Sequence, residues 1–505
     1  MIFPFLSVLA LIPLLGALLV ATAKNNTARL IALAVALIDL GYAIAVIAYS
    51  KATSNSLAES LQWLPAVGSS YSLNLDGMGL VMVAVTVLLV PAVLVAEWKT
   101  GMGETGRFSS KTFVALVLLV SSFSLFTFMS FDLLVFYVFF EATLIPMYFL
   151  IGGWGGAKRT RAAAKFLLFG LAGGLIMLLG VIGTTVLSAI NDVNSLGFIE
   201  LGQMSLATSS LTKWIFLSFF IAFALKAPMV PAHIWLPDAA EETTPGAAAL
   251  MVGILDKLGT FGMIRICVGV FPAEAQWATP VILVLALISI FYGAFAAIGS
   301  KNLMRLIAYT SISHFGFMVM CIFAMTSQSI SGSIFYMVNH ALATGALYLV
   351  VGYLIARRGS PMVSDFGGVI KVAPLAAGFT LVAGLACCAL PGTSPFVSEF
   401  MAIAGTWSRY PVIAAIAVPG TVLAAVYVLW MYQRMMTGPV TDATRSHITS
   451  DLSWRERLAL IPLVVAFLVL GFYPQPALDE IAPSTDYYMA VASLTDPDSM
   501  IEGGR

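Results

Sequence analysis

The chain consists of long apolar stretches separated by short polar joins. An α-helix rises about 1.5 Å per residue and the hydrocarbon core of a bilayer is about 30 Å thick, so about 20 apolar residues can span it. Stretches of this kind centre on residues 2–21, 28–50, 75–97, 112–129, 131–153, 162–190, 212–236, 244–272, 277–299, 302–325, 330–355, 372–405, 408–436 and 456–474. The pattern therefore predicts an all-α, polytopic membrane protein with about 14 transmembrane helices.

The composition indicates the same class. Of the 505 residues, 60 % are hydrophobic and only 10 % are charged, and the mean hydropathy is +0.96. Soluble domains carry about 25 % charged residues, so they are excluded. Because the joins are short, we expect a single membrane domain over 1–505. The first stretch lacks a basic segment before it and a cleavage site after it, and we interpret it as a retained helix.

Two of the apolar stretches contain closely spaced prolines. The seventh includes Lys226-Ala-Pro-Met-Val-Pro231 and the twelfth includes Leu390-Pro-Gly-Thr-Ser-Pro395. Such prolines release backbone carbonyls in mid-membrane, which is tolerated only against protein or a wet cavity. The two stretches are five spans apart and so run in opposite directions. Paired broken helices in inverted halves indicate a transport site.

This repeat divides the chain into four parts. Residues 1–111 are expected to form three N-terminal helices, and 112–272 the first five-helix repeat. Residues 277–436 are expected to form the inverted second repeat. Residues 456–505 are expected to form the last helix and a tail that faces the outside.

Basic residues predict the orientation of the helices. Six of the seven joins that follow odd-numbered spans hold 18 of the 25 lysines and arginines. By the positive-inside rule these joins face inwards, so both termini face outwards. The join after the seventh span is an exception, because it is acidic (Asp238, Glu241 and Glu242). Arg265 is left within a helix, and we expect it to extend towards the outer surface.

Six ionisable residues lie inside the apolar stretches, and they are Glu141, Lys226, Lys257, His314, His340 and Glu399. Most of them are close to the middle of their stretch. A charge at the bilayer centre costs about 2.5–3.5 kcal/mol even on the lenient insertion scale. A row of such residues on several helices indicates an intramembrane path for protons or ions.

Glu141 and Lys226 form the first part of this predicted path. Glu141 has no polar neighbour in the sequence, so it must be protonated or paired with a cation from another helix. Lys226 lies at similar depth beside the first helix break and is the natural partner. A pair that changes its separation would act as a switch on neighbouring groups. The alternative is a fixed ion pair that only sets helix register.

Lys257, His314 and His340 form the predicted centre of the path. A buried lysine titrates readily, and imidazole relays protons near neutral pH. Asp256 could neutralise Lys257 locally, but adjacent helical residues point about 100° apart. The histidines could also be ordinary buried core residues. His233 and His447 are weaker candidates.

Glu399 follows the second helix break and is the predicted exit. We expect the hydroxyls of Thr393, Ser394 and Ser398 to hydrogen-bond its carboxylate. The alternative is an acid that simply faces the outer surface.

The sequence argues against several other kinds of site. The four cysteines, Cys267, Cys321, Cys387 and Cys388, form no CxxC pattern, so no disulfide, zinc or iron–sulfur site is expected. Two embedded histidines are a weak basis for a haem. There is no strand-linked GxGxxG and no Walker A motif for a nucleotide.

Several ordered motifs resemble those of the antiporter-like subunits of respiratory complex I. The motifs are Glu141 with Pro146-Met-Tyr-Phe-Leu-Ile151, Leu225-Lys-Ala-Pro-Met-Val-Pro-Ala-His-Ile-Trp-Leu-Pro-Asp-Ala239, Gly253–Gly259, Ser313-His-Phe-Gly316 and Asn339-His340. In that family the residue of the twelfth span is lysine in L and N subunits and glutamate in M subunits. Glu399 therefore makes the chain similar to the M type, and the long lateral helix of L subunits is not found within 505 residues.

The resemblance implies a proton-pumping membrane subunit of NADH:quinone oxidoreductase in a bacterial inner membrane. It implies Glu141 and Lys226 as the gating pair, Lys257 and the two histidines as the relay, and Glu399 as the exit. FMN, iron–sulfur clusters and quinone would lie in partner subunits and no cofactor in this chain. Its partners would be lipid and other membrane subunits, including L-like and N-like ones, with no nucleic acid.

Two residues depart from the family pattern. Ala240 stands where a second histidine is frequent, and Asp256 stands beside Lys257 where an apolar residue is expected. Two other functions remain open at this point. One is an Mrp-type cation/proton antiporter, which shares the fold, and the other is a membrane scaffold of a redox complex that does not pump.

Overall fold

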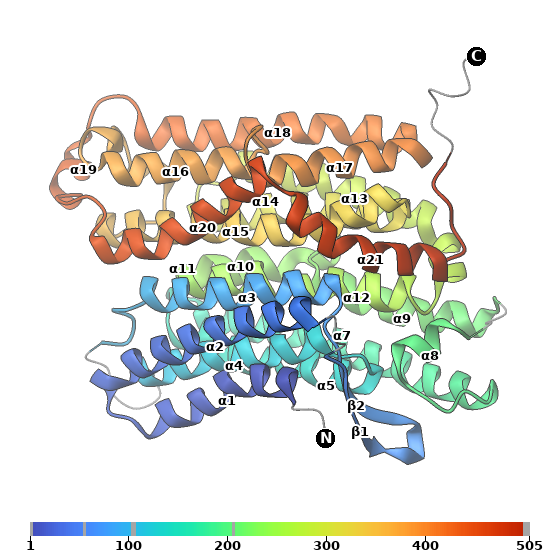
Figure 1. Cartoon of the computed structure of the whole chain (residues 1–505). Coiled ribbons are helices and arrows are strands. Elements are labelled where there is room, and N and C mark those ends of the chain that lie inside the picture. Colours follow the sequence, from blue (N-terminus) through green and yellow to red (C-terminus); the bar gives the residue numbers. More distant parts are fainter. Residues whose placement is uncertain (1–3, 54–56, 103–107, 205–207, 498–505) are drawn as a thin grey trace.

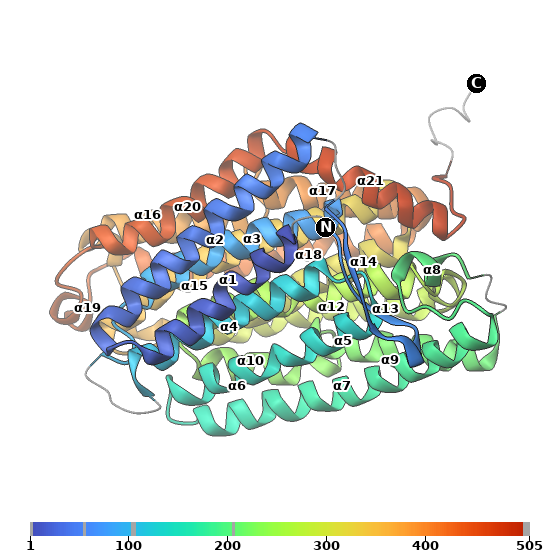
Figure 2. The same cartoon turned by 60° about the horizontal axis from the view of Figure 1, so that its bottom comes forward.

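The computed structural model describes residues 4–53, 57–102, 108–204 and 208–497. Long helices lie side by side with their axes along one common direction, as the two views in Figures 1 and 2 show. The short α19 lies at one end of this bundle, and the β-hairpin and α8 lie at the other end. The common direction is the expected membrane normal.

The helices longer than a turn and the two strands follow the apolar pattern. In chain order they are α1 (Phe5–Thr22), α2 (Asn25–Thr53), β1 (Glu59–Leu64), β2 (Ser69–Leu73), α3 (Gly77–Ala96), α4 (Ser110–Met129), α5 (Leu133–Ala142), α6 (Leu144–Gly153), α7 (Arg159–Ile190), α8 (Phe198–Gly202), α9 (Ser210–Lys226), α10 (Trp235–Glu242), α11 (Pro245–Leu250), α12 (Lys257–Gly262), α13 (Pro272–Gly299), α14 (Leu303–Ala324), α15 (Ser327–Arg358), α16 (Pro374–Cys387), α17 (Ser394–Arg409), α18 (Pro411–Met436), α19 (Asp442–His447), α20 (Trp454–Phe472) and α21 (Gln475–Val491). Two π-helical segments, Met251–Leu255 and Met263–Val268, flank α12.

Within the described residues, eleven helical segments are long and apolar enough to cross a membrane, or twelve if the bent pair α20–α21 counts as one span. α9 has only 17 residues and α16 only 14, because each ends at one of the predicted proline breaks. The polytopic all-α class is therefore confirmed, whereas the count of about 14 stays a prediction.

Burial separates central helices from peripheral ones. The apolar windows of the α11–α12 segment (Pro245–Val268) and of α15 are 100 % buried within the protein, and that of α14 is 94 % buried. The corresponding values are 28 % for α2 and 33 % for both α7 and α18. Polar side chains on the central helices are thus surrounded by protein and not by lipid, which lowers the cost of keeping them at mid-membrane depth.

Both predicted helix breaks lie where the prolines indicate. α9 ends at Lys226, and the chain resumes an α-helix at Trp235, after a single 3-10 turn over Ala232–Ile234. At the second predicted break, α16 ends at Cys387 and α17 begins at Ser394. The sequence did not indicate a further break at Thr143, which separates α5 from α6.

The segment predicted as a tail forms a helix. α21 bends by 74° from α20 and packs against α3 and α15. Its Ser484 hydroxyl accepts a hydrogen bond from the Met78 backbone at 3.2 Å, and Glu480 pairs with Lys51 at 2.6 Å. Its buried face holds Ile481 and Tyr488, so α21 is an amphipathic helix.

Arg265 is buried in an ion pair at the N-terminal end of α3, and its extension towards the outer surface stays a prediction. It is 2 % exposed and forms a two-pronged ion pair with Asp76, at 2.7 and 2.9 Å. The guanidinium also lies over the Phe131 ring, 4.4 Å from its centroid. Asp76 is 189 residues away in the sequence. This ion pair lowers the free-energy cost of burying the guanidinium, because a paired arginine keeps its hydrogen bonds.

The acidic join after the seventh span is compensated by basic residues of neighbouring helices. Asp238 pairs with Lys165 at 2.6 Å and with Arg305 at 2.8 Å, and Glu241 pairs with Arg305 at 2.8 Å. These pairs tie α10 to α7 and α14. The exception to the charge rule is therefore a structural network at the end of the broken helix.

Candidate functional site

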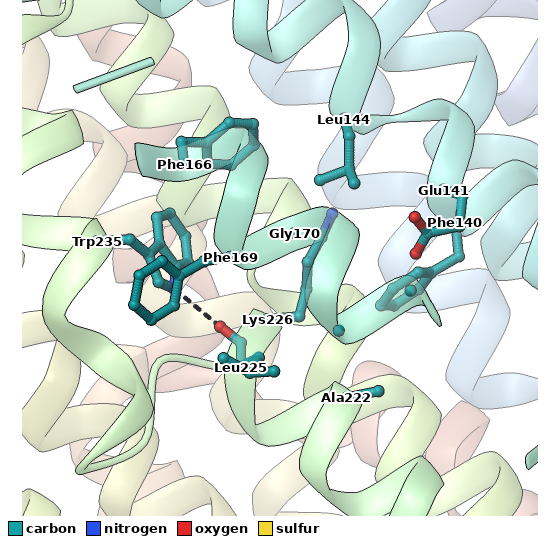
Figure 3. A pocket seen from close by; sticks show the side chains of 12 residues that line it. Phe140, Glu141, Leu144, Phe166, Phe169, Gly170, Ala222, Leu225, Lys226 and Trp235 are labelled. Carbon is teal, nitrogen blue, oxygen red and sulfur yellow. Dashed lines mark hydrogen bonds between the residues drawn. The ribbon is translucent and has the colours of Figure 1, made fainter. Parts of the chain in front are cut away.

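Glu141 and Lys226 extend into the same narrow pocket (Figure 3). Glu141 lies in the last turn of α5, and Lys226 is the last residue of α9. The Lys226 ammonium donates to the Thr143 hydroxyl at 3.2 Å and lies 4.9 Å from the centroid of the Phe140 ring. In the described part of the chain, no ion pair joins the two charged groups. They are neighbours but not in contact.

The pocket leaves the Glu141 carboxylate little free space. Glu141 Oε1 is buried and has no hydrogen-bond partner among the described residues. Across the pocket lies Gly174 of α7, where any Cβ would collide with the carboxylate. The free volume is about 10 Å³, close to the minimum of about 10–15 Å³ that one water needs. A larger residue at this position would force the Glu141 carboxylate to move from the place that it occupies here.

Lys257 lies at the centre of the protein and is fully buried. Its ammonium donates to the Val252 carbonyl at 2.7 Å and lies 2.5 Å from His340 Nδ1. The π-helical segment makes that carbonyl available, because the Asp256 amide bonds to Met251 and not, as in a regular helix, to Val252. The π-helical backbone thus provides a carbonyl acceptor for the Lys257 ammonium.

The two predicted histidines meet. The rings of His340 and His314 lie 5.0 Å apart, centroid to centroid, at an angle of 82°. His314 Nε2 lies 3.3 Å from the Tyr427 hydroxyl. His340 Nε2 is buried without a hydrogen-bond partner in the ranges that the structure describes. One imidazole therefore contacts the lysine and the other reaches towards the second helix break.

Glu399 is buried, but its partner is not the one predicted. The Tyr336 hydroxyl donates to Glu399 Oε2 at 3.0 Å. The hydroxyls of Thr393 and Ser398 instead donate to carbonyls of their own turns, Leu390 at 2.7 Å and Pro395 at 3.0 Å. Serine and threonine readily bond back to the preceding turn in this way.

The buried hydroxyl of Ser394 has no hydrogen-bond partner within the described ranges. The predicted hydroxyl cluster around Glu399 was therefore wrong.

Two tyrosines complete the chain of contacts, and the sequence analysis missed both. Tyr336 lies between Glu399 and His314. Its hydroxyl donates to Glu399, and the centroid of its ring lies 6.0 Å from the centroid of the His314 ring. Tyr427 contacts the other side of His314. A tyrosine in an apolar helix carries no distinctive signal, so only the convergence of α14, α15, α17 and α18 identifies them.

The remaining histidines lie outside this chain of contacts. His233 is buried against Tyr292, with ring centroids 4.6 Å apart. His447 lies exposed on α19 at one end of the bundle. Across the described residues, no group of three His, Cys, Asp or Glu side chains could hold a metal ion. The groups that the helices bring together are titratable side chains and tyrosine hydroxyls.

Comparison with known proteins identifies the family. The profile of the family described as "NADH:quinone oxidoreductase/Mrp antiporter, TM" matches residues 130–424. The chain belongs to this family. It is 45 % identical to the NADH-quinone oxidoreductase subunit M of Mycobacterium tuberculosis, over 98 % of this chain and 95 % of that one. It is 35 % identical to NADH-ubiquinone oxidoreductase chain 4 of Arabidopsis thaliana, over 94 % of each chain.

Solved structures show the same fold. A chain of respiratory complex I from Thermus thermophilus superposes with a TM-score of 0.86 at 28 % identity, covering 96 % of this chain and 99 % of that one. A chain of the Mrp complex from Dietzia superposes with a TM-score of 0.84 at 21 % identity, covering 97 % and 100 %. The second likeness concerns the fold alone.

Proposed function

We propose that this family member is the M-type, proton-translocating membrane subunit of NADH:quinone oxidoreductase. The observation that carries the proposal is the buried series from Lys257 through His340 and His314 to Glu399. The helical segments that carry its lysine and histidines are shielded from lipid. The identity with subunit M proteins over nearly the whole chain supports the same function. The chain itself carries no redox chemistry.

Glu141 and Lys226 act as the gating pair in this proposal. Because they share a pocket without touching, a small movement of α5 or α9 changes their separation. At about 4 Å, two unit charges interact by about 4 kcal/mol where the effective dielectric constant is about 20, and this falls as they separate. A change of that order alters which neighbouring group holds the proton.

Lys257 passes its proton to His340, with which it is already in contact. Transfer on to His314 requires a ring to turn, since no hydrogen bond joins the two rings among the described residues. The Tyr336 hydroxyl then connects this centre to Glu399, the exit group. Proton transfer can therefore be switched on and off at the contact between the His340 and His314 rings, which forms only when a ring turns.

The assembly follows from the same proposal. The chain partners other membrane subunits, including L-like and N-like ones, and the FMN, iron–sulfur clusters and quinone site lie in subunits other than this one. It lies in a bacterial inner membrane with both termini outside. Residues 112–272 and 277–436 act as the two inverted halves. An Mrp-type antiporter is the weaker alternative, because the likeness to the Mrp chain is of fold only.

The decisive experiment uses Lys226→Ala in the complete complex, reconstituted into vesicles. We expect NADH-driven proton translocation to be lost while the complex still assembles, because Glu141 is then left without its cation. Lys213→Ala is the matched control, since Lys213 is on the same helix but lies at its outer end against Trp277. Normal translocation by Lys226→Ala would refute the relay.

A further inference from the structure

Asp256 is a buried carboxylic acid that the relay described above does not use. It is 0 % exposed, and neither carboxyl oxygen has a hydrogen-bond partner among the described residues. An ionised carboxylate in such a place is costly unless nearby cations compensate it. Two cations act on it electrostatically, Lys257 and Lys226. Of the two other acids in the predicted path, Glu141 is influenced by Lys226 alone and Glu399 by neither lysine.

The packing of α12 explains why Asp256 faces the first repeat. Gly259, one turn further along, approaches α9 so closely that a Cβ would collide with the backbone of Phe223 and Ala227. Residues three apart lie on one face of a helix, so Asp256 lies on the face that meets α9 at its break. Lys226 is the last residue of α9 at this point.

Lys257 is the next residue, yet it faces the second repeat. Its ammonium contacts His340 on α15 and the ring of Phe315 on α14. Consecutive residues of a helix point about 100° apart, so these two neighbours lie on different faces, and no ion pair joins them in the described part of the chain. The backbone of α12 thus has an acid on one side and a base on the other.

We infer that Asp256 is a proton-carrying residue that connects Lys226 with Lys257, and so connects the gating pair to the histidines of the second repeat. In the first step, an N–H bond of the Lys226 ammonium breaks and an O–H bond forms on the Asp256 carboxylate. In the second, that O–H bond breaks and the proton binds the neutral Lys257 amine. This inference rests on the proposed function.

The test compares variants of Asp256 in the complete complex, reconstituted into vesicles. Asp256→Asn keeps the shape and cannot carry a proton, and we expect it to lower the rate of proton translocation by about tenfold or more, since a positioned proton-transfer group contributes about 10²–10⁴-fold to its step. Asp256→Glu keeps the carboxyl group and should restore translocation in large part.

Asp39→Asn is the matched control. Asp39 is also buried, with one carboxyl oxygen unpartnered, but it lies on the peripheral helix α2. We expect this variant to translocate protons normally. An equal loss in Asp39→Asn and Asp256→Asn would overturn the inference, because it would reflect the general cost of losing a buried carboxyl group.

Infrared difference spectroscopy during turnover provides a second readout, which a fixed counter-ion would not change. We expect a protonated-carboxyl band that changes on addition of NADH and is absent in Asp256→Asn. If Asp256→Asn translocates protons like the unmodified complex while Lys226→Ala does not, the role of Asp256 is refuted and the proposed function stands. If both variants translocate normally, the proposed function itself fails.

Discussion

The two ends of the ionisable series are built differently. Around Lys226 the charged groups share a pocket but do not touch, and a glycine opposite Glu141 keeps the space open. Around Lys257 the groups are in direct contact, with a 2.5 Å distance to His340 and a 3.0 Å hydrogen bond from Tyr336 to Glu399. The charged groups of the first region can therefore change their separation, whereas the groups of the second region already touch, apart from the two imidazole rings, which no hydrogen bond joins among the described residues.

If this contrast is correct, removing a group from the contact region has the largest effect. We expect Glu399→Gln to reduce NADH-driven proton translocation by about tenfold or more, because the amide keeps the shape but cannot exchange a proton. Glu399→Lys should retain more activity than Glu399→Ala, since lysine also titrates. Translocation in reconstituted vesicles measures all three, and equal activity of the lysine and alanine variants would contradict the exit role.

The next largest effect should come from filling the open pocket. Gly174→Ala places a methyl group on the Glu141 carboxylate, which must move away. We expect translocation to fall several-fold with little loss of stability, because a misplacement of about 1 Å can cost up to about 10²-fold in a positioned reaction. Gly173→Ala is the control, because its nearest neighbour, Leu225, would lie at an ordinary contact distance of 3.4 Å. Equal translocation rates for both variants would show that the space beside the Glu141 carboxylate does not matter for translocation.

Double-mutant cycles should give different coupling energies in the two regions. For Glu141→Gln with Lys226→Met we expect about 0.5–1 kcal/mol, the low end of the range for coupled residues, because the groups do not touch. For Lys257→Met with His340→Leu we expect about 1–3 kcal/mol, because they do. Thermal unfolding of the purified complex measures both. A larger coupling in the first pair would reverse the comparison.

The smallest effect concerns a single hydrogen bond. Tyr336→Phe removes the hydroxyl that donates to Glu399 and should cost about 1–2 kcal/mol of stability, together with a partial loss of translocation. Tyr353→Phe is the control, because the buried Tyr353 hydroxyl has no partner among the described residues. We expect the control to be as stable as the unmodified protein. If Tyr336→Phe is as stable as the unmodified protein, the hydrogen bond to Glu399 contributes nothing, and the proposed role of Tyr336 in the relay is contradicted.

The sequence predicted the parts of this molecule that depend on hydropathy. The apolar stretches predicted the all-α membrane fold, and the proline pairs predicted both helix breaks, because each is a local property. The six ionisable residues were recognised because a charge in an apolar stretch is conspicuous. Their roles remain predictions, but the structure places four of them, from Lys257 to Glu399, within one buried series.

The parts that the sequence did not predict depend on long-range contacts. The Arg265 partner, Asp76, lies 189 residues away, and nothing in either local sequence indicates the pair. The hydrogen bond to Glu399 comes from Tyr336 on another helix, while the nearby hydroxyls bond to their own turns. α21 was missed because only one of its faces is apolar, which a search for continuous apolar stretches cannot detect.

The complete enclosure of α15 has a practical consequence for work on the isolated complex. Hydrophobic mismatch and headgroup charge act on residues that face the bilayer, which here belong mainly to helices such as α2, α7 and α18. A detergent micelle or a bilayer of another thickness would tilt or strain those outer helices first. The geometry around His340 should therefore survive solubilisation and exchange of lipid, so that protonation measured on detergent-purified material reports the state of the same groups in the cell membrane.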